Sequence, residues 1–153
     1  MKNLMSEVFF YHLTHTRLEV ALPQILERAL SAQWSVELRI GMEVDVEHIS
    51  DAIWKGPDES FLPHCLEDNV KFKDFPIVLS KLRLSDIRDC LVVIDRAELQ
   101  KNEVKKFKRV CLLFDANNEI ELTNARETWK SLSDDGFNTV YWAEDQGKWK
   151  RKI

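Results

Sequence analysis

A strand, a helix and a second strand follow one another most clearly in residues 109–142, RVCLLFDANNEIELTNARETWKSLSDDGFNTVYW. The apolar run 110–114 predicts a strand covered on both faces, and residues 115–118 supply turn and helix-capping side chains. Over 119–133, apolar residues recur with the period of an amphipathic helix. They are Leu122, Ala125, Trp129 and Leu132. Gly136 predicts a left-handed helix end, and 139–142 resumes an extended pattern.

One flank of this predicted helix carries two cations beside an aromatic residue. Arg126 and Lys130 are four residues apart, so they lie on the same side of the helix, next to Trp129. Cations bordering an apolar surface suit a ligand that is anionic at one end and apolar at the other, such as a peptide ending in a carboxylate. The same triplet is also typical of a solvated flank with a core tryptophan, so both interpretations stay open at this point.

Length and composition predict one ordinary globular domain over residues 1–153. The chain is 44% hydrophobic and 31% charged, and it contains no run of apolar residues long enough to span a membrane. The first 13 residues show no small-residue cleavage site, and Glu7 interrupts their apolar stretch, so we expect no signal peptide and a cytoplasmic location. The 3 cysteines form no CxxC pair, which favours reduced thiols over a disulfide framework or a zinc site.

The charge of the chain is small overall but uneven. A formal net charge of −4 gives the whole molecule no electrostatic footprint for wrapping nucleic acid. Basic residues nevertheless gather in the C-terminal third, at 105–109, 126–130 and 148–152. Such a concentration favours an acidic partner, although a run of charges is also typical of a solvated face.

The rest of the chain alternates predicted strands with predicted helices. Strands are predicted at 7–13, 35–40, 77–79 and 90–94, helices at 18–33 and 46–54, a turn of helix at 96–99, and a long loop at 56–75. Strand 35–40 alternates apolar and polar residues as a half-buried strand does, and Pro23 marks either the first turn of its helix or a kink. The order predicts a three-layer α/β fold with a mostly parallel sheet, helices on both faces and right-handed crossovers.

Motifs for nucleotide binding or catalysis do not occur in this sequence. The chain has 4 glycines, and none forms a GxGxxG or GK[ST] loop, so the Rossmann-like shape is expected to lack a nucleotide site. His12, His15, His48 and His64 stand in no GxSxG, HExxH or SxxK frame and are interpreted as ordinary residues. We therefore predict no catalytic residue, no metal site and no cofactor.

Several segments in a fixed order resemble the chi subunit of bacterial DNA polymerase III, an accessory protein of the clamp loader. The segments are EVFFYHL at 7–13, IWKGPDESFLPH at 53–64, LLFD at 112–115, ARETWK at 125–130 and DGFN at 135–138. The likeness covers nearly the whole chain. It implies a Rossmann-like fold without a nucleotide and an adaptor role in DNA replication without intrinsic catalytic activity.

The resemblance also implies partners and their binding residues. Arg126 and Lys130 match basic residues that hold the acidic C-terminal tail of single-stranded-DNA-binding protein, and Trp129 matches the aromatic residue beside them. Trp54 and Phe61 match apolar residues on a face that meets the psi subunit or a helicase. DNA is then contacted only indirectly, and the chain alone is a monomer. The chain departs from its relatives at Leu122, where they can carry a lysine, at Tyr141 and in the extra basic residues 148–152.

Two other classes of function remain as alternatives. One is a module that binds single-stranded nucleic acid directly, with the basic C-terminal third for the backbone and Trp142 and Trp149 as stacking platforms. The other is a small hydrolase or transferase with His64 or His12 in its site. Direct nucleic-acid binding is steeply salt-dependent without any partner protein, and an enzyme shows a concave pocket with convergent titratable groups.

Overall fold

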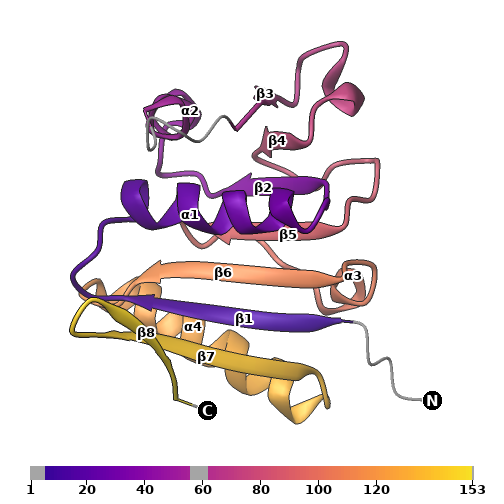
Figure 1. Cartoon of the computed structure of the whole chain (residues 1–153). Helices are drawn as coiled ribbons and strands as arrows, with labels where there is room; N and C mark the ends of the chain where they lie inside the picture. The colour runs from indigo at the N-terminus through magenta and orange to yellow at the C-terminus, as the bar shows by residue number, and fades with distance from the viewer. Residues whose placement is uncertain (1–5, 56–61, 153) are drawn as a thin grey trace.

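The computed structural model describes residues 6–55 and 62–152, and these contain a single eight-stranded sheet (Figure 1). The strand order is β3-β4-β2-β5-β6-β1-β7-β8, and every pair is parallel except β7 with β8. In chain order the elements are β1 (Glu7–Leu13), α1 (Leu18–Ser31), β2 (Val36–Ile40), α2 (Val46–Trp54), β3 (His64–Leu66), a 3-10 turn (Phe72–Asp74), β4 (Ile77–Ser80), β5 (Cys90–Ile94), α3 (Lys101–Val104), β6 (Arg109–Asp115), α4 (Glu119–Asp134), β7 (Asn138–Asp145) and β8 (Lys148–Arg151). The predicted α/β class with a mostly parallel sheet is confirmed.

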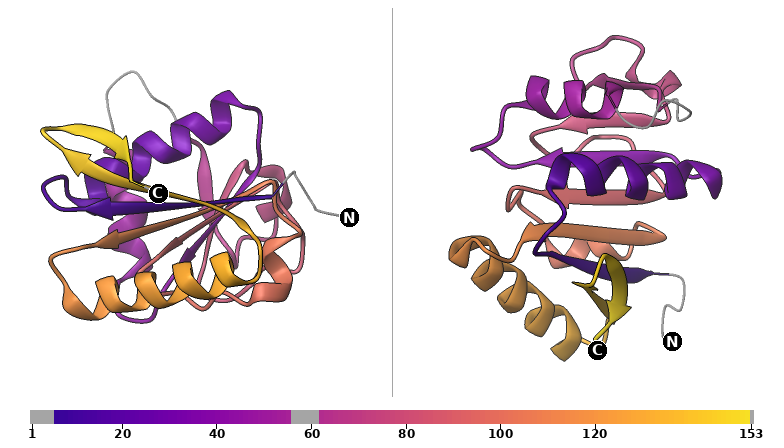
Figure 2. Two further views of the ribbon diagram at one scale, coloured as in Figure 1. Left: turned by 90° about the horizontal axis from the view of Figure 1, so that it is seen from below. Right: turned by 60° about the vertical axis from the view of Figure 1, so that its left-hand side comes forward.

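Helices cover both faces of the sheet, so the fold has three layers. Seen along the sheet in the left view of Figure 2, α1 lies on one side and α4 on the other. Successive side chains of β1 alternate between the two faces, as the pleat of a strand requires. Tyr11 and Leu13 belong to the core beneath α1 and α2, whereas Val8 and Phe10 belong to the core beneath α4. We call these the α1-side core and the α4-side core.

Helix α4 forms as its sequence predicts. The side chain of Asn118 caps its first turn by accepting hydrogen bonds from the amides of Ile120 at 3.0 Å and Glu121 at 3.1 Å. Ala125 and Leu132 are buried, and Leu122 and Trp129 are partly buried against the α4-side core. Gly136 follows the helix with φ of 86°, a conformation that glycine adopts without steric cost. The helix therefore presents its apolar stripe to the sheet and its basic flank to solvent.

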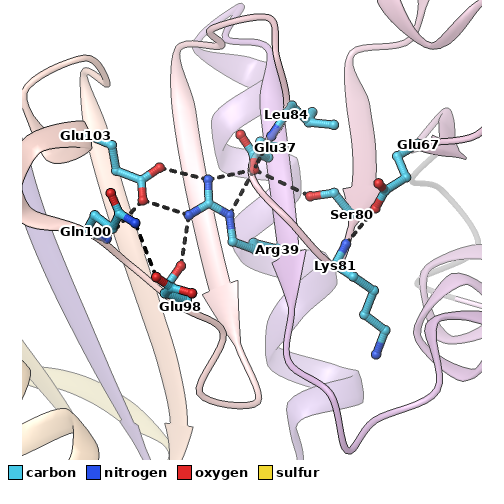
Figure 3. Close-up of polar contacts among 9 residues, drawn as sticks. All are labelled: Glu37, Arg39, Glu67, Ser80, Lys81, Leu84, Glu98, Gln100 and Glu103. Carbon is cyan, nitrogen blue, oxygen red and sulfur yellow. Dashed lines mark hydrogen bonds and ion pairs between the residues drawn. The ribbon is translucent and has the colours of Figure 1, made fainter.

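The prediction that strand 35–40 is half-buried is wrong. All five residues of β2 are buried, because β2 lies between β4 and β5 in the interior of the sheet. The charges of Glu37 and Arg39 are tolerated there because Arg39 bonds Glu37 at 2.7 Å and Glu103 of α3 at 2.9 Å (Figure 3). Its guanidinium also donates to the Glu98 carbonyl at 2.9 Å. The alternation marked a buried ion network rather than a solvent face.

Three smaller expectations also need correction, and the open alternative for Pro23 is decided. The predicted loop 56–75 contains β3, which pairs with β4, and the 3-10 turn. Residues 96–99 are not helical, and the short helix lies at 101–104. Helix α1 begins at Leu18, so Pro23 is not in its first turn. Residues 148–151, expected only as basic residues, form the edge strand β8. Short segments of this kind depend on contacts with distant strands, which local pattern does not reveal.

Candidate protein-binding surfaces

The three residues predicted to bind an acidic peptide lie together on one flank of α4. We call Arg126, Trp129 and Lys130 the basic corner. Arg126 and Lys130 are exposed, whereas Trp129 is partly buried and packs against the α4-side core. In the described part of the chain, no carboxylate forms an ion pair with either cation. Both charges are therefore available to an external anion.

Tyr141 of β7 and His12 of β1 lie on the face of the sheet that α4 covers, within the electrostatic influence of Arg126. We call these two side chains the aromatic floor. The Nδ1 atom of His12 lies 2.7 Å from the Tyr141 hydroxyl, and both side chains are half-buried. Phe114 meets each ring edge-on, at centroid distances of 5.5 Å from His12 and 6.0 Å from Tyr141. Sequence reasoning missed His12 here, because only the strand order brings β1 beside β7.

The positive charge of Arg126 acts on both His12 and Tyr141. The pKa of His12 is lowered, first by burial and then by the positive charge of Arg126, against the opposing charge of Glu144. Burial raises the pKa of the Tyr141 hydroxyl, and Arg126 acts in the opposite direction. His12 is thus neutral at neutral pH, and the floor is a neutral aromatic surface bordered by cations.

Trp54 lies on a second surface, at the end of α2. Its side chain is 53% exposed, and its ring packs on the imidazole of His64 with centroids 4.2 Å apart. The buried residues of α2 belong to the α1-side core, so Trp54 and the basic corner are on opposite sides of the sheet. Phe61, the other residue expected on this face, lies outside the described residues.

The hydrogen bonds of His64 define its tautomer. Its Nδ1 donates to the Leu62 carbonyl at 2.8 Å, because a carbonyl only accepts, and its Nε2 lies 2.9 Å from the Ser50 hydroxyl. In the neutral ring Nε2 carries no proton, so it accepts from Ser50. His64 is 4% exposed, and this burial lowers its pKa. The neutral imidazole is therefore the stable support beneath Trp54.

We predict that the protein loses stability as the pH falls below 6.5. The unfolded chain takes up a proton at the ordinary histidine pKa of 6.5, whereas folded His64 and His12 resist protonation until a lower pH. Each group contributes a loss of up to about 1.4 kcal/mol per pH unit between its two pKa values. Urea unfolding at about pH 7.5 and about pH 5.5 measures the effect, and His64→Asn, which cannot titrate there, should show a smaller change. A pKa of 6.5 or above for His64 by NMR contradicts this expectation.

Backbone amides at the carboxyl ends of two strands, where α/β proteins commonly hold phosphate groups, are bonded to the chain's own carboxylates. After β1, the amides of Thr14 and Thr16 donate to Glu144 at 2.8 Å and 3.1 Å. After β2, the amides of Glu43 and Val44 donate to Asp95 at 2.9 Å and 2.8 Å. A phosphate group at either place would have to displace a carboxylate. The two carboxylates thus stand where a bound phosphate would otherwise accept these hydrogen bonds.

The residues of the two alternative functions are engaged in internal contacts. Trp142 and Trp149 pack on the α1-side core, with edge contacts to Phe9 at 6.2 Å and to Tyr11 at 5.2 Å. Rings held in this way have less free face for stacking on nucleobases.

Across residues 6–55 and 62–152, no group of three or more His, Cys, Asp or Glu side chains is arranged to hold a metal ion. Within the same ranges, no helix is long and apolar enough to cross a bilayer.

Cys65, Cys90 and Cys111 are buried free thiols, as the sequence predicts. Burial raises the pKa of the Cys65 thiol against the positive charge of Arg88, which makes it a poor nucleophile at neutral pH.

The sheet order and the three layers define a Rossmann-like α/β protein, and its two candidate surfaces carry cationic and aromatic side chains. The family model described as "DNA polymerase III chi subunit, HolC" matches residues 5–140, and the chain belongs to this family. It is accordingly an accessory component of the DNA polymerase III complex in DNA replication. No curated protein matches the chain. Strand β8 lies beyond the matched residues.

Proposed function

We propose that this chain is a non-catalytic adaptor subunit of the cytoplasmic clamp loader, and that its basic corner binds the acidic C-terminal tail of single-stranded-DNA-binding protein. The observation that carries the proposal is the exposure of Arg126 and Lys130, each without a carboxylate partner in the described structure, beside a partly buried Trp129. The subunit then connects the clamp loader to DNA that is coated with the binding protein, without touching the DNA itself.

The charged groups and the aromatic group of such a tail each match a residue of the basic corner. A guanidinium donates two parallel hydrogen bonds to a carboxylate, so Arg126 suits the terminal carboxylate of the tail. Lys130 suits an acidic side chain, because its ammonium is a point charge with no fixed geometry. The last aromatic group of the tail packs on the apolar surface at Trp129. Salt weakens the ionic part of this binding, and an apolar part persists.

Calorimetry with a synthetic tail peptide tests the proposal. We expect saturable 1:1 binding that weakens when the terminal carboxylate is amidated and weakens again when the last aromatic residue is deleted. A direct DNA-binding module would instead bind a single-stranded oligonucleotide without any partner protein, with a steep salt dependence. Peptide binding that ignores both changes at the terminus, or tight binding of the oligonucleotide alone, contradicts the proposal.

We also propose that the surface around Trp54, together with Phe61, meets the psi subunit or a helicase. A large aromatic side chain that is 53% exposed and supported by a buried histidine is a suitable anchor for a protein partner. Because this surface and the basic corner lie on opposite sides of the sheet, both partners fit at the same time. The variant Trp54→Ala should therefore leave binding of the tail peptide unchanged.

A further inference from the structure

We propose that Lys152, which directly follows β8, is a third cation of the tail-binding site and faces Arg126 across Tyr141. The inference rests on the proposed function, because it extends the same site. It assigns a role to the hairpin of β7 and β8, which lies at the edge of the sheet (Figure 1) and whose second strand is beyond the residues that match the family model.

Strand register places Lys152 on the face of the sheet that α4 covers. In the antiparallel pair, Trp142 stands opposite Arg151, and the amide of Lys152 donates to the Tyr141 carbonyl at 2.7 Å. The pairing thus continues by one position, to Tyr141 and Lys152. Residues directly opposite each other in an antiparallel pair share a face of the sheet. Tyr141 packs on the α4-side core, so Lys152 lies on the α4 side as well.

The alternation along β8 agrees with this assignment. Trp149 stands opposite Glu144 and contacts Tyr11 of the α1-side core. The next residue, Lys150, therefore points to the α4 side, and Lys152 does so again two positions later.

The charges that act on His12 agree with the placement of Lys152 by strand register. His12 is bonded to Tyr141, and the charged groups that act on it are Arg126 of α4, Glu144 of β7 and Lys152. Arg126 and Lys152 both lower its pKa, while Glu144 raises it, so both cations approach the same imidazole. The two charges come from different elements, α4 and the residue after β8, and both act on the imidazole beside Tyr141. A peptide lying over Tyr141 would therefore meet cations from both elements.

Lys152 differs from its neighbour Lys150 in being available to a ligand. The ammonium of Lys150 lies 3.1 Å from the carboxylate of Asp145, which already satisfies its charge. Lys152 is exposed, and none of the described carboxylates is in ion-pair contact with it. On α4, the residue one turn before Arg126 is Leu122, which is apolar and packs on the core. The cations that α4 contributes to the site are therefore Arg126 and Lys130, and a third cation must come from another element.

The test compares Lys152→Gln with the matched control Lys150→Gln in the full chain, by calorimetry with the tail peptide. We expect Lys152→Gln to bind about two- to fivefold more weakly at low salt, the size of one partly exposed charge contact, and Lys150→Gln to bind like wild type. In the free protein, Lys152→Gln should also raise the pKa of His12, measured from its NMR ring resonances, because a nearby positive charge is gone.

The outcomes separate this inference from the proposed function. If the wild type does not bind the peptide, the proposed function fails, and the inference fails with it. If the wild type binds but Lys152→Gln binds equally well, only the inference fails. An equal loss in both lysine variants overturns it too, by showing a general effect of net charge, and an unchanged pKa of His12 overturns the placement of Lys152.

Discussion

Replacing Arg39 with methionine should destabilise the protein by about 3 to 5 kcal/mol, because it leaves two buried carboxylates without their common cation. Glu37 and Glu103 are 1% and 2% exposed, and the guanidinium of Arg39 bonds both of them (Figure 3). Burial raises the pKa of Glu37 despite the attraction of Arg39. Burial also acts on Glu103, but hydrogen bonds from Arg39 and from the Gln100 amide outweigh it and lower that pKa. Without Arg39, both carboxyls should favour the protonated state.

Urea unfolding at neutral pH measures this loss, and Arg96→Ala is the matched control. Arg96 pairs with Glu43 at 3.4 Å on the surface, with exposed fractions of 34% and 75%, so its removal should cost less than about 1 kcal/mol. The deficit of Arg39→Met should shrink as the pH falls towards 5, because protonation removes the unpaired charges. Equal, small losses in both variants would contradict the view that the network holds β2 to α3.

Replacing Arg126 with alanine should lower affinity for the tail peptide by about ten- to a hundredfold. The estimate follows from roughly 1.5 to 3 kcal/mol for a hydrogen bond to a charged group, at about 1.4 kcal/mol per factor of ten. Lys130→Ala should lose less, since a single ammonium does not reproduce the paired donors of a guanidinium. Arg126→Lys should recover only part of the affinity for the same reason. Stability should change little, because Arg126 is exposed and outside both cores.

Arg28→Ala is the matched control for Arg126→Ala. Arg28 is also an exposed helical arginine, but it lies on α1, on the other side of the sheet. The two variants have the same net charge, so a shared loss of affinity would show only long-range attraction between the protein and an acidic peptide. Peptide binding by Arg126→Ala that equals wild type would reduce the basic corner to a solvated helix flank.

The fold was largely predictable because long periodic segments dominate it. The apolar run of β6 and the spacing of three and four residues in α4 are each long enough for hydrophobic periodicity to predict the element. Strand β2 was misjudged because its polar residues, Glu37 and Arg39, look the same whether they face water or a distant Glu103. Strands β3 and β8 were missed because three or four residues gain their conformation from the neighbouring strand rather than from their own propensity.

The grouping of the basic corner could be predicted from the sequence, whereas its neighbours on the sheet could not. Arg126, Trp129 and Lys130 belong to one helix, so helical periodicity alone placed them together. His12 and Lys152 come from β1 and from the end of β8, and only the strand order and the antiparallel register bring them to that helix. A site assembled from elements distant in sequence requires the tertiary structure.

The most direct test of the central claim is an NMR titration that follows the indole N–H resonances of the 5 tryptophans while the tail peptide is added. Trp129 is the tryptophan on α4 and part of the basic corner, so its resonance should report contact there. Trp34 lies against the α1-side core and Trp54 at the end of α2, so both serve as internal references. We predict a saturable shift of the Trp129 resonance with Trp34 and Trp54 unmoved. A shift of Trp54 or Trp34 with Trp129 unmoved would place the tail elsewhere and contradict the account.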